Sequence, residues 1–369
     1  MIDISVPLEE ISKRLFSKME EWPLGNPVFA DPRYHPSRLT LNNFHTFKNK
    51  QDAARICFVD GGNSTIIDSP SLVVNLNRVG FCIYEEGERV EPESLQPKID
   101  FFTIASATYD GDEVKYGVEL VPLQETALEV LPEEGDLVFD SFDPTLMEGR
   151  GRANLSRVAT VSRAFAEWKL ASEAVERELE AGDMLVRDGS LQTQITGESR
   201  YSNTAYDTAL SKGVIFTGLA KTSTLFTDTG MPLFSSIAIM ANRNGLKEES
   251  WYYHPIVDIR APDHRAYMFA VKLHPMSKHV FRFELLKEQA EEMGDFGEVI
   301  QGIAQNSNDL TFPGYPYGLI EADRITRVRD EEVEPIRIQL LMAVSGLDVW
   351  DEIEAFIRTV DAHQVLDEI

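Results

Sequence analysis

The sequence predicts an α/β protein with a mixed sheet, and three observations support this fold class. Short apolar, β-rich stretches separated by turn residues recur between residues 55 and 285. A long segment at 154–180 repeats apolar residues at helical spacing. Two β-rich stretches each lead into an Asp-Gly pair, at Asp60-Gly61 and Asp188-Gly189. Strands and helices that alternate along a chain in this way commonly form a sheet covered by helices.

The first 50 residues are expected to form an arm outside the core. A helix is expected from Leu8 to Glu21, followed by an irregular stretch from Trp22 to Arg38 that contains proline and histidine. The core then begins with a buried strand at Arg55–Asp60. Two more β-rich stretches follow, at Leu72–Tyr84 and Ile99–Thr108.

The middle of the chain is expected to change from irregular structure to helix. The acidic stretch Leu120–Gly151 carries three prolines and is expected to be irregular. A helix is expected from Asn154 to about Glu180, and Ala181-Gly182 would end it. The second Asp-Gly strand follows at once, ending at Asp188. A short helix around Thr204–Lys212 and a buried strand at Val214–Leu219 come next.

The remainder is expected to be β-rich first and helical afterwards. The strands are expected at Leu233–Ala241, Trp251–Ile259, Ala266–Leu273 and Val280–Leu285. The helices are expected at Leu286–Ala304, Leu319–Asp330, Pro335–Ser345 and Val349–Leu366. This order predicts one composite domain at 51–330, with an N-terminal helical arm at 1–50 and C-terminal helices at 331–369.

Composition indicates an ordinary globular protein of the cytoplasm. Of 369 residues, 43% are hydrophobic and 26% are charged. No apolar run reaches the ~18 residues of a membrane span, and the N-terminus does not resemble a signal peptide. Cys57 and Cys82, the two cysteines, lie in apolar stretches and are expected to be core thiols in a reducing compartment.

The two Asp-Gly pairs are the strongest functional signal. A buried strand would deliver the Asp to its carboxyl end, and the glycine would let the chain turn without shielding the carboxylate. If the two strands were neighbours, Asp60 and Asp188 would meet at one open edge of the sheet. Paired carboxylates of this kind can bind divalent metal and support phosphodiester cleavage. A lone Asp-Gly is also a common turn signal, and Asp110-Gly-Asp112 is interpreted as only that.

Other residues could complete such a site. Glu167 in the 154–180 helix has apolar neighbours that would turn it toward the sheet, although it could also be solvated like the other glutamates of that helix. Lys221 follows the strand at 214–219 and could neutralise charge on a phosphate, or simply be an exposed lysine. Tyr315 and Asp323 bracket a Pro- and Gly-rich turn that feeds a helix, a segment that could also serve packing alone.

Taken in order, these segments resemble the NurA family of archaeal and bacterial nucleases. The resemblance spans about residues 55–330. It rests on Phe58-Val-Asp60-Gly, Arg163-Ala-Phe-Ala-Glu167, Leu185-Val-Arg-Asp188-Gly-Ser-Leu191, Gly218-Leu-Ala-Lys221-Thr-Ser and Tyr315-Pro-Tyr-Gly-Leu-Ile-Glu-Ala-Asp323.

The resemblance implies an RNase H-like core and a manganese-dependent deoxyribonuclease, with Mg²⁺ as the alternative ion and two ions in the site. It implies single-strand endonuclease and 5′-to-3′ exonuclease activity. Asp60 and Asp188 match the family's metal-binding aspartates, Glu167 its helix glutamate and Tyr315 its active-site tyrosine. Asp323 stands where some members have a histidine ligand, and an Asp there would favour harder ions.

The resemblance also implies a homodimer docked on a hexameric HerA-type ATP-driven translocase that resects DNA ends for recombinational repair. Such a partner would resolve a difficulty with charge. The chain has 35 Lys and Arg against 61 Asp and Glu, a net charge of −26. An acidic surface argues against strong autonomous binding to DNA, whereas a motor could feed the strand to the nuclease.

Two other functions stay open at this point. Asp60-Gly-Gly-Asn-Ser-Thr65 also resembles the first phosphate loop of actin-like and sugar-kinase ATPases, but no Gly-Gly adenosine motif follows downstream. A non-catalytic adaptor of the translocase that keeps the nuclease fold is the other alternative. The candidate carboxylates argue against an adaptor, because a dead site has no need for them.

Overall fold

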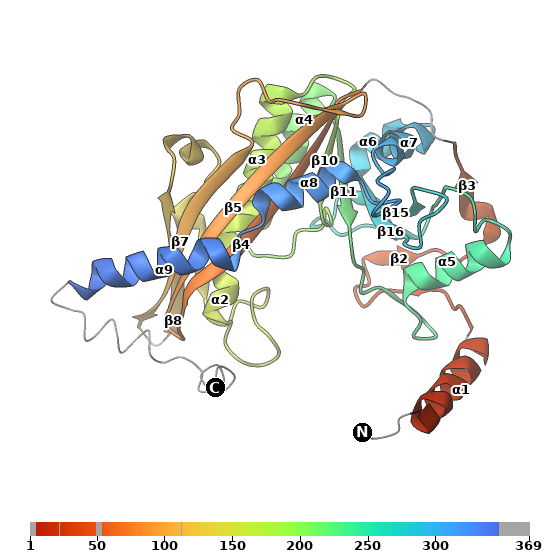
Figure 1. Cartoon of the computed structure of the whole chain (residues 1–369), viewed down its shortest axis with the longest axis horizontal. Coiled ribbons are helices and arrows are strands. Elements are labelled where there is room, and N and C mark those ends of the chain that lie inside the picture. The colour runs from red at the N-terminus through yellow and green to blue at the C-terminus, as the bar shows by residue number, and fades with distance from the viewer. Residues whose placement is uncertain (1–4, 22, 49–53, 112, 347–369) are drawn as a thin grey trace. The chain divides into compact units, whose positions relative to one another are not determined.

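The computed structural model describes residues 5–21, 23–48, 54–111 and 113–346, and the chain divides into two compact units. The first unit comprises Met1–Lys50 and Leu219–Gly314, and the second comprises Gln51–Gly218 and Tyr315–Ile369. Figure 1 shows the elements of both along the chain. This grouping differs from the three segments at 1–50, 51–330 and 331–369, whose boundaries remain a prediction.

The second unit is built on a mixed sheet with the strand order β11-β10-β4-β5-β7-β8-β9, and β6 pairs with β5. From β4 to β9 the strands are antiparallel neighbours, whereas β10 lies parallel to β4. This mixed sheet with flanking helices confirms the expected fold class. The strands are β4 (Ile56–Asp68), β5 (Leu72–Glu85), β6 (Glu88–Val90), β7 (Lys98–Asp110), β8 (Glu113–Pro122), β9 (Val138–Asp140), β10 (Met184–Asp188) and β11 (Ile215–Ala220).

Helices cover both faces of this sheet, and two glycines of β4 show which helix covers which face. Consecutive residues of a strand point to opposite faces. A β-carbon on Gly61 would meet Glu167 of α3, whereas one on Gly62 would meet the backbone of Thr326 in α8. Helices α3 and α8 therefore lie on opposite sides of β4 (Figure 1). The helices of this unit are α2 (Leu155–Val158), α3 (Val161–Glu178), α4 (Glu198–Lys212), α8 (Tyr317–Thr326) and α9 (Asp330–Ser345), with short 3-10 turns at Glu125–Glu129 and Glu134–Asp136.

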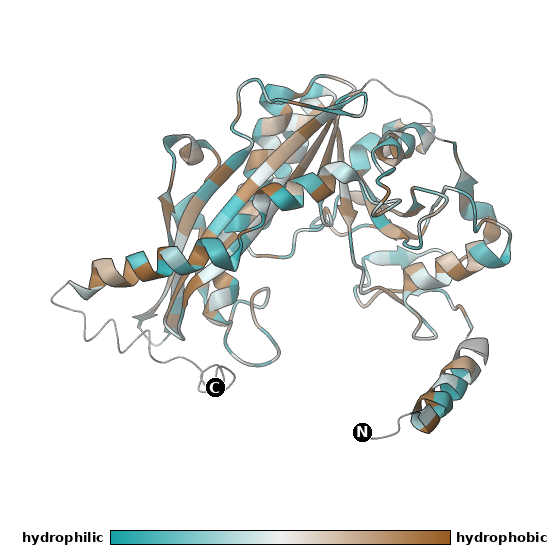
Figure 2. Ribbon diagram, in the orientation of Figure 1, coloured by the Kyte–Doolittle hydropathy of each residue, from teal (hydrophilic) through white to brown (hydrophobic). Residues whose placement is uncertain are grey.

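Apolar side chains fill the space between α3 and the sheet. Trp168 of α3 is fully buried and stacks on Phe216 of β11, with ring centroids 6.2 Å apart. Tyr206 of α4 packs edge-on against both rings. Figure 2 shows apolar residues along the strands, and alternating apolar and polar residues along α9. The free thiols of Cys57 and Cys82 are buried in this unit, as expected, and burial raises the pKa of both.

In the first unit, β3, β13, β15 and β16 follow one another as antiparallel neighbours, and the core includes Ile237, Trp251 and Tyr253. Two short strand pairs accompany it, β1 with β12 and β2 with β14. The strands are β1 (Pro27–Val28), β2 (Tyr34–Pro36), β3 (Phe44–Thr46), β12 (Phe226–Thr227), β13 (Trp251–Tyr253), β14 (Val257–Ile259), β15 (Ala266–Lys272) and β16 (Phe281–Leu286). The helices are α1 (Ser5–Glu21), α5 (Leu233–Arg243), α6 (Lys287–Glu292) and α7 (Gly297–Gln305), with a 3-10 turn at Leu41–Asn43.

Several sequence-based expectations need correction. The stretch expected to be a strand at Leu233–Ala241 is helix α5. Its buried residues Leu233, Phe234, Ile237 and Ala241 follow helical spacing, which the apolar content concealed. Strand β4 does not end at Asp60 but continues to Asp68. The expected helix at Val349–Leu366 lies outside the described residues. Among the helices that the structure describes, none is long and apolar enough to cross a membrane.

Candidate active site

Asp60 and Asp188 are brought side by side by the parallel pairing of β4 and β10. The register aligns Val186 with Phe58 and Arg187 with Val59, so Asp188 and Asp60 are the next residues along the two strands. Neighbouring strands lie about 4.8 Å apart. Both aspartates are half-buried. The expectation that the two Asp-Gly strands are neighbours is therefore confirmed, although only β10 ends at its aspartate.

The backbone and α8 hold the carboxylate of Asp60. The amide of Gly61 donates to its Oδ1 at 2.7 Å. The hydroxyl of Thr326, on α8, lies 3.5 Å from Oδ2, at the outer limit of a hydrogen bond. Asp60 therefore faces the side of the sheet that α8 covers. Asp323 belongs to this helix, and Tyr315 directly precedes its N-cap residue, Pro316.

Tyr315 stands just before α8 and is only 2% exposed. Burial raises the pKa of its hydroxyl, and the negative charges of Asp188, Asp60 and Asp323 raise it further. Tyr315 thus lies within electrostatic reach of all three carboxylates, and its hydroxyl stays protonated at neutral pH. The carboxylate of Asp323, one turn or more into α8, forms a partly exposed ion pair with Arg327.

Glu167 is held on the other face of β4, against Gly61. It is 3% exposed, and its carboxylate forms ion pairs with Arg163 on one oxygen and with Arg187 at 3.0 Å on the other. Glu167 therefore points toward the sheet, as expected from its apolar neighbours. Its carboxylate, however, is engaged by two arginines rather than turned to the aspartate pair.

Further contacts hold the side chains of Arg163 and Arg187 in place. Arg163 also donates to the carbonyl oxygen of Gly61 at 3.1 Å. Arg187 donates to the carbonyl oxygen of Ser190 at 2.9 Å, and its guanidinium lies 4.3 Å from the centre of the Trp168 ring. Neither Arg163 nor Arg187 was among the site residues predicted from the sequence. The signal was present, because Arg163 precedes Glu167 by four residues in a helix and Arg187 directly precedes Asp188.

The aspartate pair offers the carboxylate oxygens that hard divalent ions prefer, so Asp60 and Asp188 fit such an ion as its first protein ligands. Within the described residues, however, no group of three or more His, Cys, Asp or Glu side chains could hold a metal ion. Glu167 and Asp323 are both paired with arginine. The four-carboxylate ligand set expected from the sequence therefore remains a prediction.

Lys221 is exposed and follows β11 directly. It belongs to the first unit, whereas Asp60 and Asp188 belong to the second. Its proposed role at a phosphate remains a prediction.

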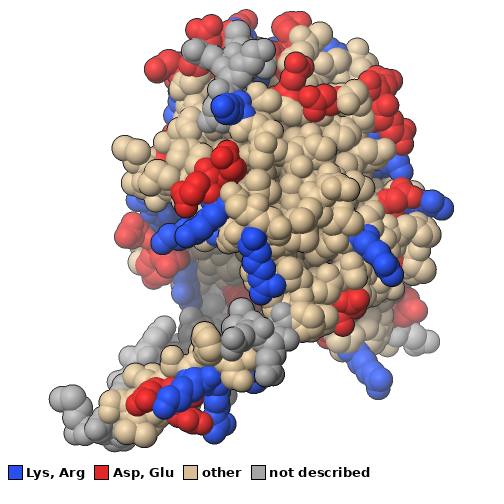
Figure 3. Space-filling view, turned by 90° about the vertical axis from the view of Figure 1, so that its right-hand side faces the viewer, with Lys and Arg blue, Asp and Glu red and all other residues tan. Residues whose placement is uncertain are grey.

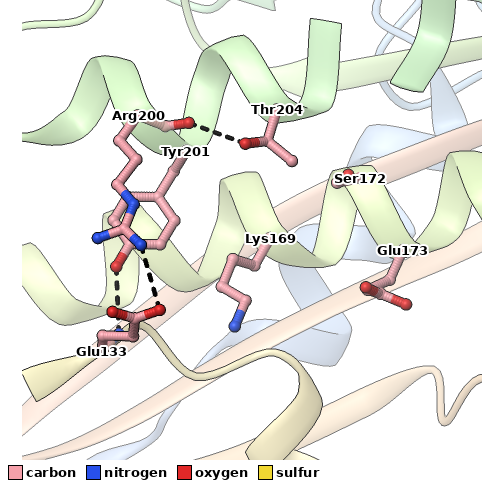
Figure 4. Close-up of a pocket in the computed structure, with 7 residues that line it drawn as sticks. All are labelled: Glu133, Lys169, Ser172, Glu173, Arg200, Tyr201 and Thr204. Atoms are coloured by element: carbon pink, nitrogen blue, oxygen red, sulfur yellow. Dashed lines mark hydrogen bonds and ion pairs between the residues drawn. The ribbon is translucent and has the colours of Figure 1, made fainter. Parts of the chain in front are cut away.

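A pocket of 180 Å³ beside α3 and α4 is a less suitable catalytic site (Figure 4). Lys169 donates to the carbonyl oxygen of Leu131 at 2.7 Å, and burial lowers its pKa. Arg200 pairs with Glu133 at 3.2 Å and with Asp136 at 2.6 Å. Lys169 and Arg200, the basic residues of this pocket, thus already have partners in the chain. Its lining residues are Glu133, Lys169, Ser172, Glu173, Arg200, Tyr201 and Thr204, none of which was a candidate.

The comparison with protein families is decisive for classification. The family model described as the NurA domain matches residues 54–328, three quarters of the chain. The chain belongs to the NurA family. The resemblance seen in the sequence is therefore confirmed, and all six candidate site residues lie within the matched span.

One solved NurA structure shares the fold of this chain. The crystal structure of the NurA nuclease from Sulfolobus solfataricus superposes with a TM-score of 0.50 at 12% identity, covering 95% of this chain and 100% of that one. A second NurA crystal structure has a TM-score of 0.48 at 8% identity, with 94% and 99% coverage. The curated proteins contain no match. At such low identity, the similarity to the first structure concerns the fold alone.

Proposed function

We propose that this NurA-family chain is a metal-dependent deoxyribonuclease that hydrolyses phosphodiester bonds, as a single-strand endonuclease and a 5′-to-3′ exonuclease. One observation carries the proposal: Asp60 and Asp188 stand side by side on parallel strands in a chain of this family. The solved relative from Sulfolobus solfataricus is described as a nuclease. The phosphate-loop alternative is disfavoured, because Asp60, Gly61 and Gly62 lie inside a strand rather than in a loop.

The chemistry follows from the residues around the pair. When bound, Mn²⁺ or Mg²⁺, in two sites, would lower the pKa of the attacking water and stabilise the leaving oxygen. Asp60 and Asp188 would hold the ions, with Asp323 as a further ligand once released from Arg327. Glu167, on the other face of β4, would join them only if its side chain left Arg163 and Arg187 and passed the edge of the strand. The protonated hydroxyl of Tyr315 would donate a hydrogen bond to a phosphate oxygen, where charge develops during hydrolysis. Lys221 would add a compensating positive charge.

The charge of the chain supports a partner that delivers DNA. With a net charge of −26, the protein gains little from the phosphate contacts that drive autonomous binding. On the face drawn in Figure 3, Lys and Arg side chains stand singly around a broad uncharged area instead of forming a continuous basic surface. A homodimer docked on a HerA-type hexameric translocase would present the strand mechanically, in resection of DNA ends for repair.

The test is a DNA degradation assay on strands labelled at the 5′ or 3′ end, as single strands and as duplexes. It is run with Mn²⁺, with Mg²⁺ and with a chelator, in the presence and absence of the cognate translocase. We expect Asp60→Ala and Asp188→Ala to abolish degradation while circular dichroism and thermal unfolding show an intact fold. Asp110→Ala, in an exposed hairpin end, is the matched control and should keep full activity.

Two results would contradict parts of the proposal. Full activity in either folded aspartate variant would remove the site assignment. Degradation that is no faster with the translocase than without it would remove the explanation that a partner delivers DNA to an acidic nuclease.

A further inference from the structure

The first unit contains a cavity of 320 Å³ that the proposed nuclease chemistry does not use. It lies among helix α5, the start of β13, the end of β15 and the segment that leads to β16. A volume of this size is typical of a small-molecule site. Its lining residues are Ala238, Asn242, Lys247, Glu248, Trp251, Lys272, Pro275, Met276, Ser277, Lys278 and Val280.

The lining is basic although the chain is strongly acidic. Three lysines and one glutamate contribute to it, in a protein whose net charge is −26. Lys247 and Lys278 are exposed, so their ammonium groups can reach a ligand. Because like charges repel, three lysines around one space are most favourable when an anion lies between them.

Lys272 supplies a fixed positive charge beneath the cavity. It is only 6% exposed, and its ammonium donates to the carbonyl oxygens of Lys247, of Glu249 at 3.2 Å and of Pro275 at 2.8 Å. Burial lowers its pKa, Glu248 and Glu249 raise it, and Lys247 lowers it. These carbonyl oxygens use all three ammonium protons. Lys272 therefore orders the wall and attracts an anion through its field, while direct contacts come from other residues.

Trp251 provides a hydrogen-bond donor at the same wall. Its side chain is 1% exposed, and its indole Nε1–H has no hydrogen-bond partner among the described residues. Buried donors are nearly always paired, so an orphaned indole N–H at a cavity wall points to an acceptor that the chain itself does not supply. Pro275, Met276 and Val280 give the cavity an apolar side as well.

We propose that this cavity binds a nucleotide through its phosphate group, either as a free mononucleotide or as the end of a DNA strand. Lys247 and Lys278 contact the phosphate oxygens, and the buried indole N–H of Trp251 donates once the side chains that cover it move aside. The base or sugar packs on the apolar side. All lining residues belong to the first unit, so the site does not depend on the Asp60–Asp188 pair.

The test is calorimetric titration of the full chain in chelator, which prevents degradation. The ligands are deoxyadenosine monophosphate, deoxyadenosine, and a short single strand with or without a 5′-phosphate. We expect the phosphorylated ligand to bind and its unphosphorylated counterpart to bind at least about tenfold more weakly, the effect of losing charge-assisted hydrogen bonds. Binding of the monophosphate identifies a free nucleotide, and binding of the phosphorylated strand alone identifies a strand end.

Matched variants locate the binding. Lys247→Ala/Lys278→Ala should weaken it about tenfold or more, and Trp251→Phe should weaken it while keeping the ring in place. Lys48→Ala/Lys115→Ala removes an exposed and a partly exposed lysine elsewhere and should bind as the wild type does. The proposal is overturned if neither phosphorylated ligand binds, if phosphate makes no difference, or if both double variants lose binding equally. The Asp188→Ala variant should bind normally, which separates this site from the nuclease.

Discussion

Gly61 lies directly against the carboxylate of Glu167: a β-carbon on Gly61 would come within 2.4 Å of Oε1 of Glu167. Since Glu167 is paired with Arg163 and Arg187, any side chain at this position would disturb the whole ion-paired group. Because Gly61 has no side chain, the carboxylate of Glu167 in α3 can lie directly against β4. It does not turn the chain, because β4 continues past it.

Replacement of Gly61 by alanine should destabilise the fold by about 2 kcal/mol, the usual cost of overpacking. It should also lower nuclease activity, because Asp60 directly precedes Gly61 and accepts a hydrogen bond from its amide. Urea unfolding and the DNA degradation assay measure the two effects. Gly117→Ala in β8 is the control, since its β-carbon would meet no atom within 4 Å. Equal stability of the two variants would show that Glu167 moves aside at no cost.

Glu167→Gln should cost about 3 kcal/mol or more, because it leaves two arginines next to an uncharged amide in a buried site. Chemical denaturation at neutral pH measures this loss. On the same helix, Glu173→Gln breaks a more exposed pair with Arg177 and should change stability little. An unchanged unfolding free energy in Glu167→Gln, together with lost activity, would instead favour a role for Glu167 in metal binding alone.

Glu178 should make the stability of the second unit depend on pH. Its carboxylate accepts hydrogen bonds from the amides of Glu93, Ser94 and Leu95 at 2.7, 2.8 and 2.7 Å, and from the Ser94 hydroxyl at 2.9 Å. Burial acts to raise the pKa of Glu178, but these hydrogen bonds lower it overall. A lowered folded-state pKa stabilises the fold above the unfolded-state pKa, and this contribution is lost as the pH falls through the folded-state pKa.

Glu178→Gln should therefore cost about 2 kcal/mol near neutral pH, and the difference from the wild type should shrink below about pH 4. Urea unfolding across this range gives both values. A difference that stays constant with pH would show that the charge of Glu178 contributes nothing and that only its shape matters.

The apolar residues before Asp60 and Asp188 were enough to predict that each aspartate follows a buried strand. That the two strands are neighbours was a condition of the predicted site, and the pairing of β4 with β10 meets it. The length of β4, which continues to Asp68, could not be predicted from the sequence. Gly61 to Thr65 looks like a turn by composition, yet long-range pairing with β5 keeps these residues extended, with Gly61 opposite Val79 and Gly62 opposite Arg78. Tertiary pairing thus overrides local turn preference.

The ion pairs of Glu167 could not be predicted from the sequence either. Its apolar neighbours indicated that it faces the sheet, but its ion pair with Arg187 depends on the packing of α3 against β10, a contact between separate elements. Helix α5 was mistaken for a strand because an apolar stretch about ten residues long fits either structure. Only the helical spacing of its buried residues, which the structure reveals, distinguishes a helix from a strand in this stretch.

Tyr315→Phe should lower nuclease activity about 10²-fold, the usual effect of removing one donor aimed at developing charge, and should leave the fold intact because the ring keeps its packing. Since burial and the charges of Asp188, Asp60 and Asp323 raise its pKa, the hydroxyl stays protonated past about pH 10, where an ordinary tyrosine ionises. Ionisation of Tyr315 should therefore cause no loss of wild-type activity below that pH.

Tyr317→Phe, two residues further on and half-buried, is the control and should remain active. Full activity of Tyr315→Phe, or a fall in wild-type activity near pH 9 that this variant lacks, would exclude a protonated tyrosine donor.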